Sequence, residues 1–344
     1  NNLLTTSGAG SVTVTGLGAN INNSASGTVN VTLANNADGL YTVTSSTAIT
    51  VANGTAQDND TITLEGAGNK TVTGLAADLS LGATNVGTTN VSSVAGNALT
   101  ITADAAAGSL TVDAASLAQN TALTLAGGGN SKTATVNNLV GDIVATSLNS
   151  VLSVDLANAG DNGISITTGT YNTTIADSAS GDTITVAAGA MADNTTLTTS
   201  GAGSFTITGL SADLANTATG TITVTLEDDG GTVSSTISSS GSVGGVTVNS
   251  GTFDNTDTIV LAGTDTITVA ATATTNVTTG TASANVSETT GNTVSINASS
   301  MTDNNLLTTS GAGSVTVTGL GANINNSASG TVNVTLADNV DGLY

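Results

Sequence analysis

The sequence predicts an all-β protein, a parallel β-solenoid (β-helix) built from tandem repeats. Three observations lead to this fold class. Apolar Val, Ile or Leu alternates with Thr in short runs, which is the period-2 pattern of a strand with one apolar face. No window shows the i, i+3, i+4, i+7 apolar spacing of a helix. The chain of 344 residues also repeats itself, on a long period and on a short one.

The predicted strands follow one another along the whole chain. They are expected at residues 11–15, 28–33, 61–64, 98–104, 109–113, 163–168, 182–187, 221–226 and 266–270. Gly, Asn, Asp and Ser fill the gaps between them, and these residues tolerate positive φ or bond their own backbone at turns. The sequence contains no Pro, so every strand residue can donate its backbone N–H to a neighbouring strand.

The long period is 303 residues. Residues 1–41 return at 304–344 with substitutions at only two positions, 35 and 37. Such near-identity indicates recent tandem duplication, because sequences that merely share a fold keep little more than their hydrophobic pattern. We therefore interpret the chain as one period of a longer array, with the next copy just begun.

Each long period is built from smaller copies. The string GAGSVTVTGLGANI of residues 8–21 recurs in related forms, and a string such as QDNDTIT precedes it. The Asn of this second string marks repeat units, which we place at 1–58, 59–119, 120–193, 194–254 and 255–303, with 304–344 as the start of the next period. These units are 58, 61, 74, 61 and 49 residues long. Three coils of ~20 residues would make one unit, and the differences in length would be added or missing coils.

Tandem β-sandwich domains are the alternative architecture. A sandwich normally needs ~100 residues and a buried aromatic side chain in its core. The units are shorter than this, and the whole chain holds three Tyr and two Phe. A solenoid needs neither feature, because each coil stacks on its neighbours around a narrow apolar core. The sequence therefore favours the solenoid.

The charge of the chain excludes several classes of function. Lys70 and Lys132 are the only cations, and the formal net charge is -22. Nucleic acid and anionic membrane surfaces are unsuitable partners, since binding them depends on Lys and Arg. No apolar run is long enough for a membrane span. With no His and no Cys, a triad base and a thiol nucleophile are both missing, and no enzymatic activity is predicted.

The two lysines occupy related places, each just after a glycine-rich turn. A functional interpretation is a covalent or ionic link to a neighbouring chain. We favour the simpler interpretation that both are exposed charges that offset nearby Asp residues, each contributing at most ~1 kcal/mol.

Calcium is the one ligand that the sequence predicts. Ca²⁺ takes about six to eight oxygen ligands, and Asp stands beside Asn at the junctions between repeat units. The predicted ligands are Asp58, Asp60, Asp193, Asp254, Asp257 and Asp303, together with the adjacent pair Asp228 and Asp229. The competing interpretation is that these are exposed turn residues, with Asn ladders stacked along the solenoid.

The GAGSVTVTGL-type repeats, the DNTxLT-type junctions and the near-identical long duplication occur in an acidic chain without Cys or His. This combination resembles the giant repetitive β-strand-repeat surface and secreted proteins of bacteria. They include cyanobacterial cell-surface giants, filamentous-haemagglutinin-like adhesins and repeat-rich surface-layer proteins. The resemblance implies export to the cell surface and a structural or adhesive role.

Taken with the composition, the resemblance predicts a structural extracellular protein that forms a rod, filament or coat at a bacterial cell surface. Its expected partners are other copies of itself and the cell envelope or matrix. A surface-layer lattice subunit and the stalk of a large adhesin stay open as alternatives, either of them stabilised by calcium. A functional amyloid is weaker, because irregular unit lengths count against in-register cross-β stacking. Ice binding by ranks of Thr is weaker too, because Thr is an ordinary outward residue in strands.

Overall fold

The computed structural model describes residues 2–35, 39–57, 59–156, 163–228, 232–254, 256–289 and 291–338. All regular secondary structure in these residues is β-strand. A search of the same residues for a helix long and apolar enough to cross a membrane finds none. By its internal contacts the chain divides into two compact units, Asn1–Thr173 and Thr174–Tyr344.

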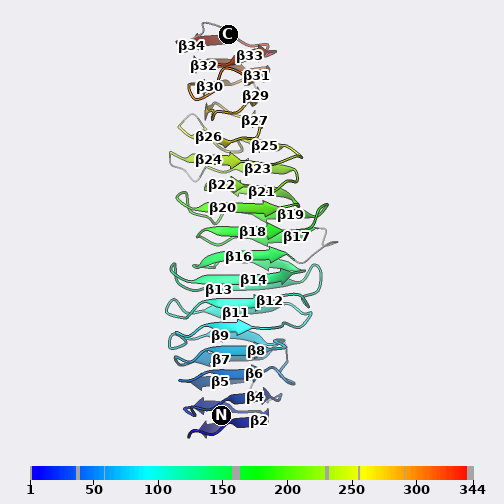
Figure 1. Cartoon of the computed structure of the whole chain (residues 1–344), viewed down its shortest axis with the longest axis vertical. Coiled ribbons are helices and arrows are strands. Elements are labelled where there is room, and N and C mark those ends of the chain that lie inside the picture. The colour runs from blue at the N-terminus through cyan, green and yellow to red at the C-terminus, as the bar shows by residue number, and fades with distance from the viewer. Residues whose placement is uncertain are drawn as a thin grey trace. The chain divides into compact units, whose positions relative to one another are not determined.

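The first unit is a stack of coils with two parallel sheets, one made of odd-numbered and one of even-numbered strands (Figure 1). The odd sheet contains β1 (Leu3–Thr6), β3 (Asn20–Asn23), β5 (Leu40–Ser45), β7 (Thr61–Glu65), β9 (Asp78–Leu81), β11 (Leu99–Ala103), β13 (Ala122–Gly127), β15 (Asp142–Val144) and β17 (Ile164–Thr167). The even sheet contains β2 (Val12–Leu17), β4 (Val29–Leu33), β6 (Ile49–Ala52), β8 (Lys70–Thr73), β10 (Thr89–Val91), β12 (Leu110–Asp113), β14 (Thr133–Leu139) and β16 (Val151–Leu156). The short strand β18 (Thr173–Asp177) includes the boundary between the two units.

The second unit has the same construction. Its odd sheet contains β19 (Thr183–Ala187), β21 (Ser204–Leu210), β23 (Ile222–Leu226), β25 (Val246–Asn249), β27 (Ile267–Ala271), β29 (Ala284–Glu288), β31 (Leu306–Gly311) and β33 (Asn323–Asn326). Its even sheet contains β20 (Thr196–Gly201), β22 (Asp213–Asn216), β24 (Ser234–Ser239), β26 (Thr258–Gly263), β28 (Thr275–Thr278), β30 (Thr293–Asn297), β32 (Ser314–Leu320) and β34 (Val332–Leu336).

Each coil contributes one strand to each sheet, so a strand pairs with the strands two places before and after it. A short coil carries the chain from Ile62 to its partner Leu79. A longer coil carries it from Leu99 to its partner Leu123. The predicted parallel β-solenoid is therefore confirmed, and each of the nine predicted strands overlaps an observed one.

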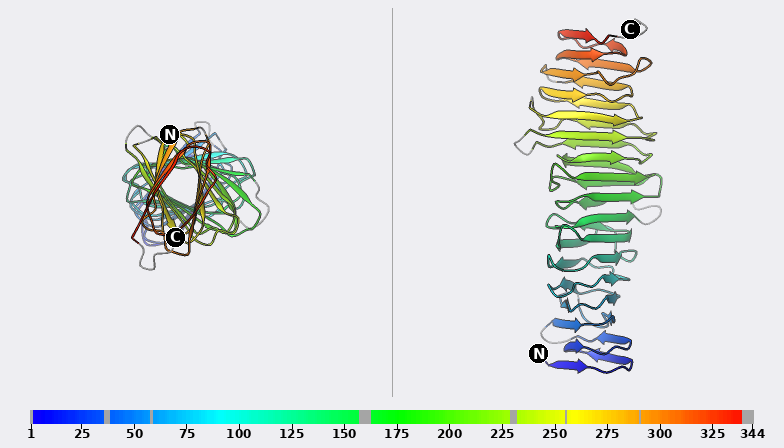
Figure 2. Two further views of the ribbon diagram at one scale, coloured as in Figure 1. Left: turned by 90° about the horizontal axis from the view of Figure 1, so that it is seen from above. Right: turned by 60° about the vertical axis from the view of Figure 1, so that its left-hand side comes forward.

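The core of each unit lies between its two sheets, which face one another when the coils are viewed along the stack (Figure 2). Strand β4 is typical: Val29, Val31 and Leu33 are each 1% exposed, while the two residues between them point outward. This alternation follows from the pleat, which sends successive side chains to opposite faces. Each fully buried Val or Leu contributes roughly 1.5–3 kcal/mol through the apolar area removed from water.

The repeat units differ in length by half coils. The first strands after the successive junctions are β1, β7, β13, β20, β26 and β31, so the described residues of the five units contain six, six, seven, six and five strands. The 74-residue unit has seven strands and the 49-residue unit has five. The 74-residue and 49-residue units therefore differ by one whole coil, as expected, whereas each differs from the six-strand units by half a coil, which the expectation of whole coils did not include. One strand with its turn is the smallest insertion that keeps the chain winding between two sheets.

Because of these half coils, the first strand of the repeat joins one sheet in some copies and the other sheet in others. In the second unit, the copy that begins at Asn194 places its first strand, β20, in the even sheet and its second, β21, in the odd sheet. The copy that begins at Asn304 does the reverse with β31 and β32. Among the strands of the described residues, β31 comes 30 positions after β1, so one 303-residue period equals 15 coils and the next copy begins on a strand of the same parity.

Candidate functional site

The junctions that we predicted to bind calcium form tight turns just before the first strand of a repeat. In each, the backbone N–H of the last turn residue donates to the carbonyl three residues earlier. The donors are Asp60 (3.0 Å), Thr121 (3.1 Å), Thr195 (2.9 Å), Asp257 (3.3 Å) and Asn305 (2.9 Å). The structure therefore gives these aligned positions a shared role in closing a turn.

The two acidic residues at this position are buried and bonded to backbone. Asp60 is 3% exposed and Asp257 is not exposed at all. Asp60 Oδ2 accepts from the Gln57 amide at 2.8 Å, and Asp257 Oδ2 accepts from the Asp254 amide at the same distance. Asp257 Oδ1 also accepts from the Val233 amide at 3.0 Å. These carboxylates thus accept hydrogen bonds from amides of their own turns and, for Asp257, of a neighbouring segment. The competing interpretation is right that they are turn residues and wrong that they are exposed.

The other predicted ligands are more exposed. Asp254 Oδ1 accepts from the backbone N–H and the hydroxyl of Thr256, both at 2.7 Å. These bonds, the backbone one first, hold the pKa of Asp254 below its usual value. Asp193 and Asp228 are half-buried, and Asp303 is exposed.

Asp58 and Asp229 lie outside the described residues. Within the described ranges no group of three or more acidic side chains gathers in a way that could hold a metal ion. Asp254 and Asp257 share one turn, and the other described candidates, Asp60, Asp193, Asp228 and Asp303, belong to other segments of the chain. Calcium binding therefore stays a prediction.

A buried polar ladder runs along one corner of the coils. Thr6 Oγ1 donates to Asn23 Oδ1 at 2.7 Å. Asn23 Nδ2 donates onward to Ser45 Oγ at 2.8 Å and to Thr47 Oγ1 at 3.0 Å. Asn23 is 1% exposed, so these bonds satisfy a side chain that would be costly to bury alone.

The same ladder recurs in the second unit. Thr199 Oγ1 donates to Asn216 Oδ1, and Asn216 Nδ2 donates to Ser239 Oγ, each at 2.8 Å. In the last copy, Thr309 Oγ1 donates to Asn326 Oδ1 at 2.7 Å. We had expected Asn ladders only as a general alternative. A sequence signal does identify this ladder. In each of these three copies, a Thr near the end of one strand is followed 17 residues later by an Asn, which lies at the end of the neighbouring strand in the same sheet.

Lys70 corrects the interpretation that both lysines are exposed. Its side chain is 1% exposed, and its ammonium donates to the carbonyls of Gly66 (2.5 Å), Gly68 (2.6 Å) and Ser45 (3.5 Å). Burial lowers its pKa to about 8, against an opposing attraction to Glu65. Lys70 begins strand β8 at a core-facing position, so the strand pleat directs it inward, where its stem packs and its ammonium reaches the corner carbonyls.

In two copies, the first Gly of the glycine-rich turn packs closely against the backbone of an acidic residue in the preceding coil. Gly201 and Gly311 have φ of +98° and +106°. A Cβ at Gly201 would overlap the carbonyl oxygen of Asp177, and a Cβ at Gly311 would overlap that of Glu288. The recurrent Gly is therefore required by both the backbone conformation and the close approach of two coils. Both acidic residues are fully buried, a placement that the sequence reasoning missed.

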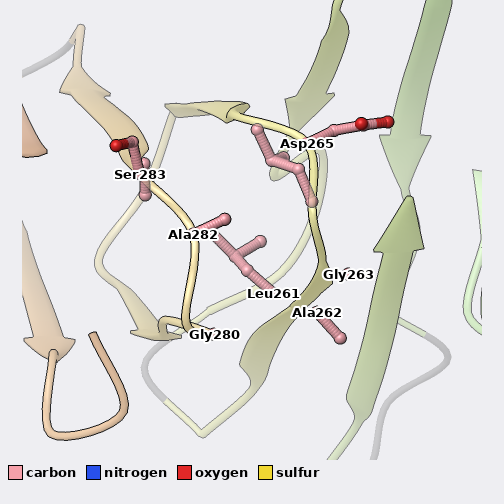
Figure 3. Close-up of a pocket in the computed structure, with 9 residues that line it drawn as sticks. Leu261, Ala262, Gly263, Asp265, Gly280, Ala282 and Ser283 are labelled. Carbon is pink, nitrogen blue, oxygen red and sulfur yellow. The ribbon is translucent and has the colours of Figure 1, made fainter. Parts of the chain in front are cut away.

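A small pocket in the second unit lies between the turns beside β26 and β29 (Figure 3). Leu261, Ala282 and Gly280 are among its lining residues, and its volume of about 10 Å³ is near the minimum for one water molecule. The oxygens of Asp265 and Ser283 point away from the space between Leu261 and Ala282. The pocket therefore lacks convergent polar groups with which to orient a ligand.

Larger hollows lie on strand faces and carry no titratable side chain. One of about 270 Å³ in the first unit is lined by residues of 26–29 and 47–50 with Asn69 and Thr71. One of about 250 Å³ in the second unit is lined by Thr258 and by residues of the neighbouring strands β28, β30 and β32. Thr, Ser and Asn are the most numerous lining residues of both, so the polar groups that these hollows offer are neutral hydrogen-bonding groups, with no acid or base.

Comparisons of the chain with protein-family models, with curated proteins and with solved structures found no match. The interaction that recurs along the described residues is the hydrogen bonding of one coil to the next, through the backbone ladders and the corner Thr–Asn–Ser bonds.

Proposed function

We propose that the chain is a segment of a structural extracellular repeat protein that forms a rod, filament or coat at a bacterial cell surface. The proposal includes self-association and attachment to the cell envelope or matrix. Its mechanism is mechanical: stacked strands satisfy their backbone groups along the stack, and a narrow core of small apolar residues lets near-identical coils follow one another.

The observation that supports this proposal best is that the 303-residue period equals a whole number of coils, 15. A period with a leftover half coil would place each successive copy on the opposite sheet. Whole coils let every copy meet its neighbours in the same way, which a long uniform array requires. The two half-coil changes inside the period cancel one another to give this result.

The acidic charge of the chain supports the same role. A net charge of -22 makes neighbouring arrays repel one another, which disfavours sideways aggregation of a chain so rich in strands. With only two cations, one of them the buried Lys70, little positive charge is left to attract an acidic neighbour.

Cryo-electron microscopy of material shed from cells tests the proposal. We expect fibres whose power spectrum has a meridional reflection near ~4.8 Å and an axial repeat of about 72 Å, the height of 15 coils. Beaded fibres without the ~4.8 Å reflection, or shed protein that forms no assembly, would contradict it. A two-dimensional lattice would instead support the surface-layer alternative, and single stalks with a terminal globule would support the adhesin alternative.

A further inference from the structure

One corner of the second unit carries charges that its counterparts lack. The corner at 216–221 reads NTATGT, and the corners at 23–28 and 326–331 both read NSASGT. The corner between β18 and β19 reads DSASGD. Asp177 stands where the other copies have Asn, and Asp182 stands where they have Thr. Two neutral side chains are thus replaced by carboxylates within one turn.

This corner keeps the local fold of its neutral counterparts. Asp177 Oδ1 accepts a hydrogen bond from the Ala179 amide at 3.0 Å. Asn216 Oδ1 accepts from the Ala218 amide at the same distance. The second polar atom differs, because Asn216 has an amide donor there, which bonds Ser239 Oγ. Asp177 has an oxygen instead, so the corner gains an acceptor where the other copies have a donor.

Both carboxylates of this corner face the interior. Asp177 is fully buried, and Asp182 is 3% exposed. Asp182 lies two residues before Ile184, on the same inward face of the chain. A Cβ placed on Gly203 would overlap Asp177 Oδ2 and would lie 2.8 Å from Ile184 Cδ1. The two Asp side chains therefore enter the same corner of the core.

The charge of Asp182 is not balanced within the second unit. Its Oδ2 atom is buried and accepts no hydrogen bond from the described residues. A buried carboxylate is costly unless it is paired or coordinates a metal. Lys70 and Lys132 are the only cations of the sequence, and both precede Thr174, where the second unit begins. The unit itself therefore supplies no positive side chain for this oxygen.

We propose that Asp177 and Asp182 form a buried calcium site at the corner between β18 and β19, separate from the junction turns. One divalent cation balances the two carboxylate charges. Ca²⁺ prefers oxygen ligands, and each carboxylate can bind it through one oxygen or through two, with carbonyls and water completing the shell. Mg²⁺ fits a buried corner less well because it gives up its water reluctantly.

Hydrogen exchange of the full chain, with Ca²⁺ or with a chelator, tests the site. The reporting amides belong to Ala179, Ala202 and Ser204, which donate to the two Asp residues. With Ca²⁺ at about ten times its dissociation constant, their exchange should slow about tenfold. The Ala25 amide, which makes the matching bond in a neutral corner of the first unit, should not respond. Absence of slowing at the three amides, or equal slowing at Ala25, would overturn the proposal.

Two variants assign the response to these side chains. Asp177→Asn combined with Asp182→Thr restores NSASGT, which already forms a corner at 23–28, and should abolish the slowing. Asp213→Asn removes a carboxylate elsewhere in the unit but keeps the oxygen that accepts from the Thr236 amide, and should retain the slowing. Equal responses of the two variants would overturn the assignment. The site does not depend on how chains assemble, so its failure would leave the proposed function standing.

Discussion

Strands β4 and β34 have the same sequence, VNVTL, and opposite surroundings. In β4 the three apolar side chains are each 1% exposed. In β34 every residue is exposed or half-buried. The difference teaches that the repeat supplies only one side of its own core, and that the coil stacked above it supplies the other. Stability in such a chain is a sum of contacts between neighbouring coils.

The two copies are incomplete on opposite sides. A Cβ at Gly8 would have no atom within 4 Å, whereas the equivalent Gly311 lies on the Glu288 carbonyl. The first copy therefore lacks a coil below, within the described residues, and the last copy lacks one above. Paired substitutions at matching positions can separate the effect of the sequence from the effect of the neighbour.

The largest effect is expected from Leu33→Ala compared with Leu336→Ala. Leu33 is 1% exposed and Leu336 is 47% exposed. Truncation of the buried leucine should lower the free energy of unfolding by about 2–5 kcal/mol, and truncation of the exposed one by under ~1 kcal/mol. Chemical denaturation of the two variants measures this. Equal losses would mean that β34 is covered in solution.

Lys70 differs from Val315, the residue at the same place in the last repeat. Because burial lowers the pKa of Lys70 to about 8, the folded chain releases this proton at lower pH than the unfolded chain, whose Lys titrates near 10.4. The free energy of unfolding should therefore rise with pH from about 8 to about 10.5, by at most about 3 kcal/mol.

The Lys70→Met variant isolates this effect. Its free energy of unfolding should lack the rise between pH 8 and 10.5 that the parent chain shows. Lys132→Met, at the related place in another repeat, should retain it. Denaturant titrations at a series of pH values provide the measurement, and an identical rise in parent and Lys70→Met chains would refute the assignment.

A smaller difference is expected between Gly311→Ala and Gly8→Ala. Both positions have positive φ, +106° and +102°, so both variants carry backbone strain. Only the Ala at 311 also meets a backbone carbonyl, which should destabilise it by about 1–3 kcal/mol more than the Ala at 8. Thermal unfolding of the two variants compares them directly. A larger loss for Gly8→Ala would show that another coil lies against the first copy.

Substitutions in the corner ladder should give a difference in the free energy of unfolding that is similar to this or smaller. Asn23→Ala removes bonds to Thr6, Ser45 and Thr47 inside the core, and should cost about 1–3 kcal/mol. Asn326→Ala removes only the contacts to one side and should cost under about 1 kcal/mol. Hydrogen exchange at 20–33 and at 323–336 reports each locally. A larger acceleration at 323–336 in Asn326→Ala than at 20–33 in Asn23→Ala would contradict the ordering.

Calcium is expected to give the smallest effect. At a concentration of about ten times the dissociation constant, Ca²⁺ would raise the free energy of unfolding by about 1.4 kcal/mol. Asp254→Asn should abolish the part due to the turn that also holds Asp257. Thermal unfolding with Ca²⁺ and with a chelator measures this, and identical curves in the two conditions would rule the prediction out.

The alternation of residues such as Val29, Val31 and Leu33 was enough to predict the strands and, with the short repeat, the solenoid. It was not enough to place Lys70. A lone Lys in a Thr-rich strand is usually exposed, and only the register of β8 against β6 and β10 shows that it faces the core. Asp60 and Asp257 were recognised as chemically distinct, but they accept from amides of their own turns and, for Asp257, of a neighbouring segment, which no spacing rule specifies.

By itself, the sequence determined the period-2 strands, the short turns and the 303-residue duplication, because these depend on side-chain alternation and on residues that tolerate turn conformations. Only the tertiary structure decided which sheet each repeat enters. Insertion or loss of one strand moves every later strand to the opposite sheet, and the alternation of residues within those strands does not change. The tertiary structure also decided which copy of VNVTL is buried. A side chain in a solenoid is buried by contact with the adjacent coil, and the sequence of one coil does not show whether that adjacent coil is present.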